Sequence, residues 1–488
     1  MNMLMDIIYE QAVGEDFIGR VIILSPQKYL SMGFKLQFFV GLLLAVAGYL
    51  IFSSHFSKPE PVHVDENAWF GSGQPKKDDE AIRPFKISVP DEVLNDLENR
   101  LQSARISHDP LEDSNNFYYG FNSKYLKEVR EHWLKSYSWK KHEDQLNSFS
   151  HFKTQIGGIQ VHFIHQKPPS SSYKKTYPLL IVHGWPGNVY EFYKIIPLLT
   201  DPKKHGISSE IAFEVVAPSI PGYGWSESPH KTGYSQIEAA NTFQRLMSRL
   251  GFKKYYLQGG DWGSLIVVNL VRLWPEQVLG VHLNMVGIMP FSTFKCASIH
   301  FMGSIFPSLF FSSPNVGPDH NAIEIFKLFT IETGYLHIQA TRPDTVGTSL
   351  NDSPIGLAAY ILEKFSVWTN LKENRGFQDG ALTKKFTLDE LLTIVMVYWV
   401  NGNIVNSQRF YREFFLDTRH MNLDSHYVSI PVAHASGLNE YFDRNPVELS
   451  RCQLNITHYN EYYFGHFAAF EEPKILAQDV FDFVKSLH

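Results

Sequence analysis

The stretch Gln258–Ser264 (QGGDWGS) constrains the fold of this chain more than any other part of the sequence. The aromatic run Tyr255–Leu257 precedes it and the aliphatic run Leu265–Val271 follows it, so the pattern predicts a strand, a tight turn and a helix. Glycines stand two positions before and two positions after Asp261, and small residues there let a chain turn so sharply that its central side chain is exposed. We therefore expect Asp261 at the tip of this turn.

Asp261 has two possible roles at such a turn. An aspartate in the place of a nucleophile attacks an electrophilic carbon directly and becomes an ester, which water must then open. The alternative is a helix-capping aspartate after a glycine turn, because Asp is a preferred N-cap residue. On this stretch alone, the two interpretations are equally good.

Length and charge exclude several classes of protein. With 488 residues, the chain is long enough for one large catalytic unit with additions or for two to three ordinary domains. A formal net charge of -6 without a basic block gives no electrostatic footprint for nucleic acid. We expect no cofactor and no metal ion.

Only two cysteines are present, Cys296 and Cys452. They are too few for a disulfide framework or a four-thiolate zinc site, and this favours a reducing compartment. The triplet Asn455–Thr457 fits the N-glycosylation motif, which matters only if the catalytic part faces a lumen.

Shifts in composition divide the chain into six segments. We expect an N-terminal extension (1–33), a transmembrane anchor (34–53), a linker with accessory helices (54–150), the first part of an α/β core (151–289), a helical lid (290–417) and the second part of the core (418–488).

The anchor rests on the uncharged run Leu36–Phe52, which is at the short end of what a bilayer core of roughly 30 Å requires of a helix. The triplet Ala45–Ala47 is typical of a cleaved signal peptide, but the apolar run continues beyond it and a long segment precedes it, so an uncleaved anchor is favoured. Lys28 and Lys35 on one side and Lys58 on the other leave the orientation undecided.

Strands and helices alternate on both sides of the expected lid. This alternation predicts right-handed crossovers and a mostly parallel sheet that is covered on both faces. Ser235 and Glu238 have the spacing of a capping box. The expected strands are Ile159–Ile164, Leu179–Val182, Phe213–Ala217, Val278–Met285, Val428–Val432 and Ile456–Tyr459, and the expected helices are Pro90–Leu101, Lys124–Leu134, Ile237–Leu250, Leu388–Val400 and Pro473–His488.

A catalytic triad can be assembled in the order that α/β-hydrolases use, which is nucleophile, acid and histidine. Asp261, Glu440 and His466 follow that order, with Glu440 after a returning strand and His466 in the loop before the last helix. Asp443 is the competing acid. A lone histidine is more often structural, but the loop position and the upstream carboxylate favour a catalytic base.

The segment His183–Gly187 (HGWPG) directly follows an apolar strand. The backbone amides of Trp185 and Trp262 are candidates for an oxyanion hole, because they can face the charge that develops when water attacks an ester of Asp261. The alternative is an ordinary turn between a strand and a helix.

Seven strings of this sequence resemble the microsomal epoxide hydrolases, and the likeness covers residues 66–488. They are Ile82–Lys86, His183–Gly187, Pro218–Gly224, Gly259–Gly263, Thr333–Gln339, Ser407–Tyr411 and Gly465–Pro473.

The resemblance implies an α/β-hydrolase fold with a mostly parallel sheet, a helical lid insertion, N-terminal accessory helices and a membrane anchor. It implies hydrolysis of lipophilic epoxides to vicinal diols through a covalent ester on Asp261, without a cofactor, at the endoplasmic reticulum membrane with the catalytic part on the cytoplasmic side. Tyr335 and Tyr411 match two lid tyrosines that hydrogen bond the epoxide oxygen. A phenol with a pKa near 10 can donate to the resulting alkoxide without being ionised at pH 7.

The sequence departs from the family at three places. The stretch between Glu440 and His466 is slightly shorter, Phe464 stands where mammalian members have a glycine, and a long segment precedes the anchor. Two alternatives remain open, a haloalkane dehalogenase and a membrane-anchored binding protein without turnover. The preferred epoxide is also left open.

Overall fold

The structure, a computed structural model, describes residues 61–169, 173–287, 292–305, 310–311, 322–440 and 446–488. In these ranges one sheet of nine strands has the order β1-β2-β3-β5-β4-β6-β7-β8-β9. The strands from β5 to β9 pair in parallel, and β1, β2 and β3 add an antiparallel edge. The strands are β1 (Arg83–Phe85), β2 (His151–Ile156), β3 (Ile159–Gln166), β4 (Lys175–Val182), β5 (Ile211–Pro218), β6 (Tyr255–Gly259), β7 (Val278–Leu283), β8 (Val428–Gly437) and β9 (Leu454–Tyr462).

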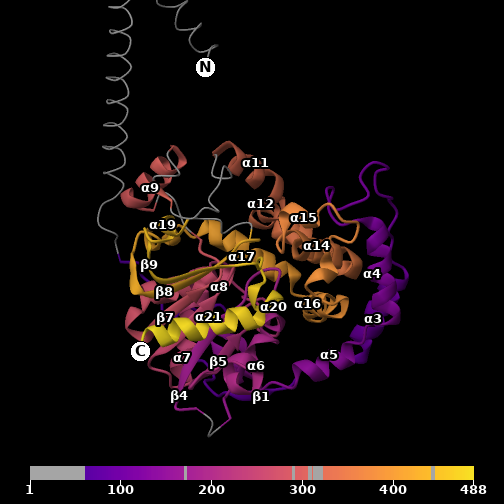
Figure 1. The fold of residues 1–488 in the computed structure, drawn as a ribbon. Coiled ribbons are helices and arrows are strands. Elements are labelled where there is room, and N and C mark those ends of the chain that lie inside the picture. The colour runs from indigo at the N-terminus through magenta and orange to yellow at the C-terminus, as the bar shows by residue number, and fades with distance from the viewer. Residues whose placement is uncertain (1–60, 170–172, 288–291, 306–309, 312–321, 441–445) are drawn as a thin grey trace, which may run out of the picture. The chain divides into compact units, whose positions relative to one another are not determined.

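Helices cover the sheet, and Figure 1 shows α21 (Pro473–Ser486) crossing in front of the strands. This helix contacts α6 (Ile195–Thr200), while α7 (Gln236–Arg249) and α8 (Trp262–Leu273) contact each other on the sheet. Every residue of β6 is buried, as expected of a central parallel strand. The α/β architecture predicted from the alternating pattern is confirmed.

Between β7 and β8 the described elements are all helical. One of them, α16, begins with a capping box in which Thr387 and Glu390 bond each other's backbone amides. The helices are α9 (Phe294–Ile305), α11 (Ala322–Glu332), α12 (Gly334–Thr341), α13 (Pro343–Asp352), α14 (Pro354–Val367), α15 (Leu371–Asn374), α16 (Leu388–Asn401), α17 (Ile404–Leu416) and α18 (Arg419–Leu423), with a 3-10 turn at η5 (Leu382–Lys384).

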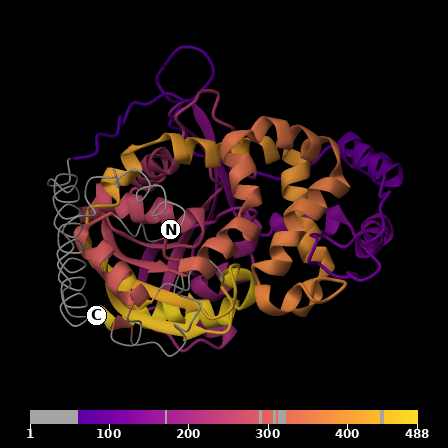
Figure 2. The same ribbon diagram turned by 90° about the horizontal axis from the view of Figure 1, so that it is seen from above.

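The accessory helices pack against this helical segment, as both ribbon views show (Figures 1 and 2). They are α3 (Asp91–Gln102), α4 (Ser123–Lys135) and α5 (Trp139–Leu146). On α3, Arg100 donates to Asp352 Oδ1 over 2.7 Å, and on α4, His132 Nε2 lies 2.7 Å from Asp389 Oδ1. The hydropathy pattern alone could not place these helices, because both contacts join residues more than 250 positions apart.

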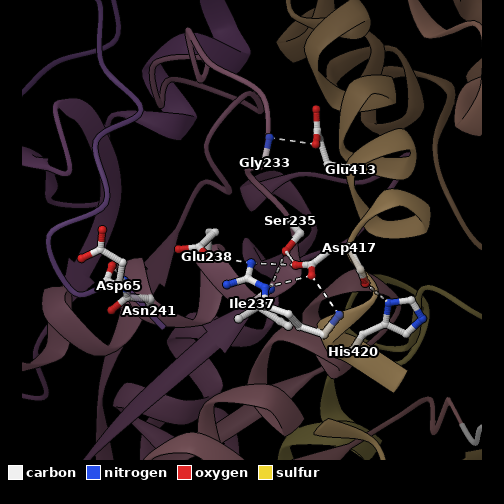
Figure 3. A network of polar contacts seen from close by, with 10 residues as sticks. Asp65, Gly233, Ser235, Ile237, Glu238, Asn241, Glu413, Asp417 and His420 are labelled. Carbon is white, nitrogen blue, oxygen red and sulfur yellow. Dashed lines mark hydrogen bonds and ion pairs between the residues drawn. The ribbon is translucent and has the colours of Figure 1, made fainter. Parts of the chain in front are cut away.

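The C-terminal end of the helical segment is hydrogen-bonded to the N-terminus of α7 (Figure 3). Ser235 caps α7 by accepting from the amide of Ile237, and its hydroxyl donates to Asp417 over 2.6 Å. The expected capping box is wrong in one half, because the Glu238 carboxylate pairs with Arg419 at 2.8 Å instead of with the backbone of Ser235.

The two cysteines form a disulfide, which the composition did not predict. Cys296 on α9 is bonded to Cys452, which lies just before β9, with Cα atoms 5.3 Å apart and a separation of 156 positions in sequence. The short helix α19 (Val447–Ser450) precedes Cys452 and contacts α9. The pairing differs from the expectation that two cysteines are too few to build a disulfide framework, because a single bond joins two distant segments of the chain.

The predicted anchor, residues 34–53, lies outside the described residues. In the part of the chain that the structure describes, no single helix has both the length and the apolar character of a membrane span. Helices α16 and α17 reach that character only when taken together, and they are bent by 89° at their junction.

Candidate active site

Asp261 occupies the tip of a sharp turn between β6 and α8, as the sequence predicts. Its backbone has φ 50° and ψ -132°, in a region that a residue with a side chain rarely adopts. Such a conformation costs roughly 1–3 kcal/mol and persists only where the surrounding structure enforces it. Although Asp261 stands at the N-cap position of α8, its side chain makes no capping hydrogen bond. The carboxylate points instead towards the residues described below.

Two glycines permit the close packing of this turn. A Cβ at Gly263 would lie 1.9 Å from the carbonyl oxygen of Val182, and a Cβ at Gly184 would lie 2.2 Å from Asp261 Oδ1. Both distances are far below van der Waals contact. The turn and the end of β4 therefore approach each other only because these positions lack side chains.

His466 lies between two carboxylates. Its Nδ1 is 2.7 Å from Glu440 Oε2, and its Nε2 is 3.3 Å from Asp261 Oδ2. Glu440 follows β8 and His466 follows β9, so the carboxyl ends of neighbouring parallel strands bring the three residues together. The competing acid Asp443 lies outside the described residues.

The charge state of His466 follows from this arrangement. Burial opposes protonation of the ring, but the carboxylates of Glu440 and Asp261 outweigh it and raise the pKa of His466 well above its usual value. The two carboxylates therefore favour the protonated imidazole, and loss of either negative charge would make it release its proton more readily.

The amide of Trp185 donates to Asp261 Oδ1 over 2.7 Å. Trp262 is the first residue of α8, where backbone amides have no partner within the helix. Of the two amides predicted as an oxyanion hole, that of Trp185 is bonded to the carboxylate, and the place of the Trp262 amide in such a hole stays a prediction. Oδ1 is held in this way, whereas Oδ2 remains on the side of His466.

Tyr335 on α12 and Tyr411 on α17 pack around Trp185, whose amide holds the carboxylate of Asp261. Their ring centroids are 6.0 Å apart, and both rings contact the indole of Trp185 at centroid distances of 5.3 and 5.8 Å. Burial, with the charge of Asp261 adding to it, raises the pKa of both phenols well above 10. The two hydroxyls are therefore proton donors throughout the physiological range.

Two buried glutamates near the triad were missed by the sequence reasoning. Glu471 accepts from the amides of Gly465 and Phe467 over 2.8 and 2.9 Å, so it holds the loop on both sides of His466. Glu191 lines a cavity of about 20 Å³ together with Asp261 and His466, a volume that holds one water molecule. Nothing in the sequence around Glu191 indicates this position, because it depends on the space left by Gly187.

Lys364 and Trp368 on α14 were also missed. The Lys364 ammonium lies 5.0 Å from the centroid of the Tyr335 ring, and the Trp368 ring lies 4.8 Å from that of His466. An apolar helix such as α14 gives no signal that its side chains line a site. A cation over an aromatic ring is attracted by the negative face of that ring.

Burial raises the pKa of Glu191 to about 8, with the positive charge of His466 opposing the rise and the charge of Asp261 adding to it. When folding raises the pKa of an acid, the protein loses stability as the pH rises from the pKa in the unfolded state to the pKa in the folded state. The variant E191Q, which cannot ionise, should therefore gain stability over the wild type as the pH rises from about 4.5 to about 8, by several kcal/mol, and the gain should then level off.

The measurement is the free energy of unfolding in urea for both proteins at pH 5, 6, 7, 8 and 9. The relevant quantity is the difference between the two proteins, because other groups titrate equally in both. A difference that stays constant over this range would show that Glu191 is ionised throughout.

Other features of the described residues do not belong to this site. No group of three His, Cys, Asp or Glu side chains among them could hold a metal ion. A larger cavity of about 490 Å³ lies beside Tyr234, Arg342 and Arg409, and none of the predicted catalytic residues lines it.

Two family models match the chain. The model described as the epoxide hydrolase N terminus matches residues 82–192, and the model of the α/β hydrolase fold matches residues 177–313. The first spans the accessory helices and the first core strands, and the second spans the turn at Asp261.

The chain is similar to known proteins over almost its whole length. It is 46% identical to epoxide hydrolase 1 of Sus scrofa, over 91% of this chain and 98% of the relative. It is 42% identical to juvenile hormone epoxide hydrolase 1 of Ctenocephalides felis, over 90% of this chain and 94% of the relative.

Solved structures agree with these relatives. The crystal structure of juvenile hormone epoxide hydrolase from Bombyx mori superposes with a TM-score of 0.81 at 37% identity, over 87% of this chain and 99% of the other. The structure of Aspergillus niger epoxide hydrolase gives a TM-score of 0.66 at 26% identity, over 86% of this chain and all of the other. Together with the geometry around Asp261, these similarities show that the chain belongs to the epoxide hydrolases of the α/β-hydrolase fold.

Proposed function

We propose that the protein is an epoxide hydrolase of the microsomal type, in which Asp261 is the nucleophile. The Trp185 amide is bonded to Asp261 Oδ1, and the other carboxylate oxygen, Oδ2, attacks an epoxide carbon. The bond between that carbon and the epoxide oxygen then breaks. Tyr335 and Tyr411, whose phenols are neutral, donate hydrogen bonds to the departing oxygen, and one of them transfers its proton to that oxygen and becomes a phenolate. The product of this step is an ester of Asp261.

Ester formation then changes the role of His466. The reaction removes the negative charge of Asp261, one of the two charges that raise the pKa of His466, so the imidazolium gives up its proton, which restores the phenolate to a phenol. Oriented by Glu440, the neutral imidazole takes a proton from the water that attacks the ester carbonyl, and it returns that proton to the diol oxygen as the ester bond breaks. The carbonyl oxygen, Oδ1, already lies against the amide of Trp185, which stabilises the oxyanion that develops there.

The observation that carries this proposal is the position of Asp261 between the Trp185 amide and His466. It is tested by a single turnover in water labelled with heavy oxygen. The label should enter the carboxylate of Asp261 and be absent from the first diol, because water attacks the ester carbonyl. Label in that first diol would show that water attacks the epoxide itself, and the nucleophile assignment would fall.

A haloalkane dehalogenase is the alternative with the same nucleophile. One observation favours it, since the indole Nε1–H of Trp262 is buried without a hydrogen-bond partner among the described residues and could donate to a halide. The pair of lid phenols and the curated relatives favour epoxides instead. Assays of halide release from haloalkanes and of diol formation from epoxides distinguish the two functions. A binding protein without turnover is disfavoured, because Asp261, Glu440 and His466 are all present and in contact.

We propose lipophilic epoxides as the substrates, since the phenols lie among the aromatic side chains of Trp185, Trp262 and Trp368. The relatives from Ctenocephalides felis and Bombyx mori are named for the epoxide of juvenile hormone. A product profile over a terpenoid epoxide, an arene oxide and an epoxy fatty acid tests which class is preferred.

For the location we propose the endoplasmic reticulum membrane, with residues 34–53 as a single span. The support is the uncharged run Leu36–Phe52 and the resemblance to the microsomal enzymes. Of the two faces of that membrane, the family resemblance favours the cytoplasmic one, whereas the disulfide of Cys296 and Cys452 favours the lumenal one.

Deleting residues 1–55 should weaken membrane attachment, because it removes the apolar run that spans the bilayer. The full-length protein should sediment with membranes and require detergent for release, and the shortened protein should be released more easily. Sedimentation after washes at low salt, at high salt and with detergent measures the difference. Recovery of the full-length protein in the soluble fraction at low salt would contradict the anchor.

A further inference from the structure

The carboxyl group of Glu191 fills the place that a side chain at position 187 would take. A Cβ at Gly187 would lie 1.1 Å from Glu191 Oε1 and 2.2 Å from its Cδ, and the next atom, at 3.1 Å, is Oε2 of the same group. Gly187 does not have a positive φ, so its backbone could carry a side chain. A glycine is therefore required at position 187 because of the Glu191 carboxyl group beside it.

This carboxyl group lines the cavity of about 20 Å³ next to the triad. Glu191 belongs to the 3-10 turn η1 (Val189–Phe192), and only 8% of its surface is exposed. Asp261, Asn284 and His466 supply further polar groups to the cavity wall. A buried water molecule needs two to four polar partners, and these side chains can provide them. The cavity can therefore hold one water molecule beside the carboxylate that becomes the ester.

Two of the other side chains at this wall are held in place by contacts outside it. His466 Nδ1 is bonded to Glu440, so Nε2 faces Asp261 Oδ2 at 3.3 Å, and Nε2 has no hydrogen bond of good geometry among the described residues. Asn284, which follows β7, accepts from Gln258 Nε2 over 2.8 Å through its Oδ1. The base is thus aimed at the reacting carboxylate, and Asn284 has a fixed orientation.

We infer that Glu191 is a positioning residue for the water that opens the ester of Asp261. The inference rests on the proposed reaction and adds a residue to its second step. The attacking water gives one proton to His466 Nε2, and its other hydrogen needs an acceptor, which is the carbonyl oxygen of the Glu191 carboxyl group. A lone pair of the water oxygen then remains for the ester carbon. No bond of Glu191 forms or breaks in this step.

The uncharged form of Glu191 suits this role. Burial raises its pKa to about 8, the positive charge of His466 opposes the rise, and the negative charge of Asp261 adds a smaller amount. Both charges are lost once the ester has formed and the imidazole is neutral, and the larger of the two effects is the one that lowers the pKa. Glu191 therefore stays uncharged at pH 7 and does not repel the oxyanion that develops on the ester.

The test follows single turnovers of the full-length protein with styrene oxide, a small lipophilic epoxide, by quenched flow and intact-protein mass spectrometry. The variant E191L removes the acceptor and keeps a side chain of similar size. Adduct formation should keep its rate, because that step uses no water, whereas adduct decay should slow by roughly 10- to 100-fold. The variant E191Q keeps a carbonyl oxygen and should be slowed less than E191L.

The variant G187A moves the same carboxyl group without changing Glu191 itself. Its Cβ would overlap Glu191 Oε1, so the carboxyl group has to leave its place at the cavity wall. Decay in G187A should therefore slow about as much as in E191L, and the double variant should show no further loss, because both changes remove one interaction. G376A is the matched control, since a Cβ at Gly376 would meet nothing closer than 3.5 Å.

Stability separates this role from a structural one. E191L removes a buried acid, so at pH 8 it should unfold at no lower urea concentration than the wild type, although it hydrolyses the ester more slowly. A residue with a structural role would give reduced stability, and formation and decay of the adduct would slow together.

The possible failures point to different conclusions. Decay at the wild-type rate in both E191L and G187A would overturn the inference and leave the proposed function intact. Equal slowing of both steps with reduced stability would also overturn it, because Glu191 would then be a structural residue. The proposed function fails in another way, if no adduct accumulates in His466→Gln, and the inference would fall with it.

Discussion

Asp261→Ala is expected to form no covalent adduct with an epoxide, whereas His466→Gln is expected to form the adduct and then stall. The difference follows from the two steps, because attack by the carboxylate needs no base and hydrolysis of the ester does. Loss of a general base slows a step by roughly 10²- to 10⁴-fold. Mass spectrometry of the intact protein during a single turnover measures both the formation and the decay of the adduct.

Glu440→Ala serves as the intermediate case in the same experiment. It should slow hydrolysis less than His466→Gln does, because the carboxylate orients the imidazolium and forms no bond to the substrate. Circular dichroism of each variant controls for folding. An adduct on Asp261→Ala, or decay at the wild-type rate in His466→Gln, would contradict the assigned roles.

Replacement of both lid tyrosines by phenylalanine should slow the first step far more than either single replacement does. A hydrogen bond to a charged group contributes about 1.5–3 kcal/mol, which corresponds to roughly 10- to 150-fold in rate for each phenol. The stacking of Tyr335 on Trp185 and the edge contact of Tyr411 with Trp262 need only the rings, so folding should be unchanged.

Rapid-quench measurement of adduct formation gives the rate of this step, and the decay of the adduct is the internal control. The decay should keep its wild-type rate in Tyr335→Phe, because the phenol acts on the epoxide oxygen and not on the ester. Adduct formation at the wild-type rate in the double variant would remove both residues from the mechanism.

The sequence predicts the parts of this protein that depend on local rules. The turn around Asp261 is specified by flanking apolar runs and by glycines within four residues, and the structure places its strand and helix at β6 and α8. Asp261, Glu440 and His466 each follow a parallel strand, and the carboxyl ends of these strands lie at the same edge of the sheet. The order of the three residues along the chain is therefore enough to predict that they lie close together.

What the sequence could not predict depends on long-range packing. Glu191 lies near the triad because a neighbouring glycine leaves space for it, and Glu471 lies there because it bonds the loop that carries His466. No spacing rule indicates either position. The partner of Glu238 is Arg419, 181 residues away, which displaces the expected capping contact. The disulfide joins cysteines 156 positions apart, and a count of two cysteines says nothing about their distance in space.

The bracing of the lid by α3 and α4 bears on how substrate preference can change. Arg100 and His132 contact Asp352 and Asp389 across the boundary between the accessory helices and the helical segment. These contacts therefore contribute to the positions of α13 and α16, which belong to the same helical segment as Tyr335 and Tyr411. Selection or engineering that adjusts these surface contacts could retune which epoxides fit without altering any residue that lines the reaction chamber.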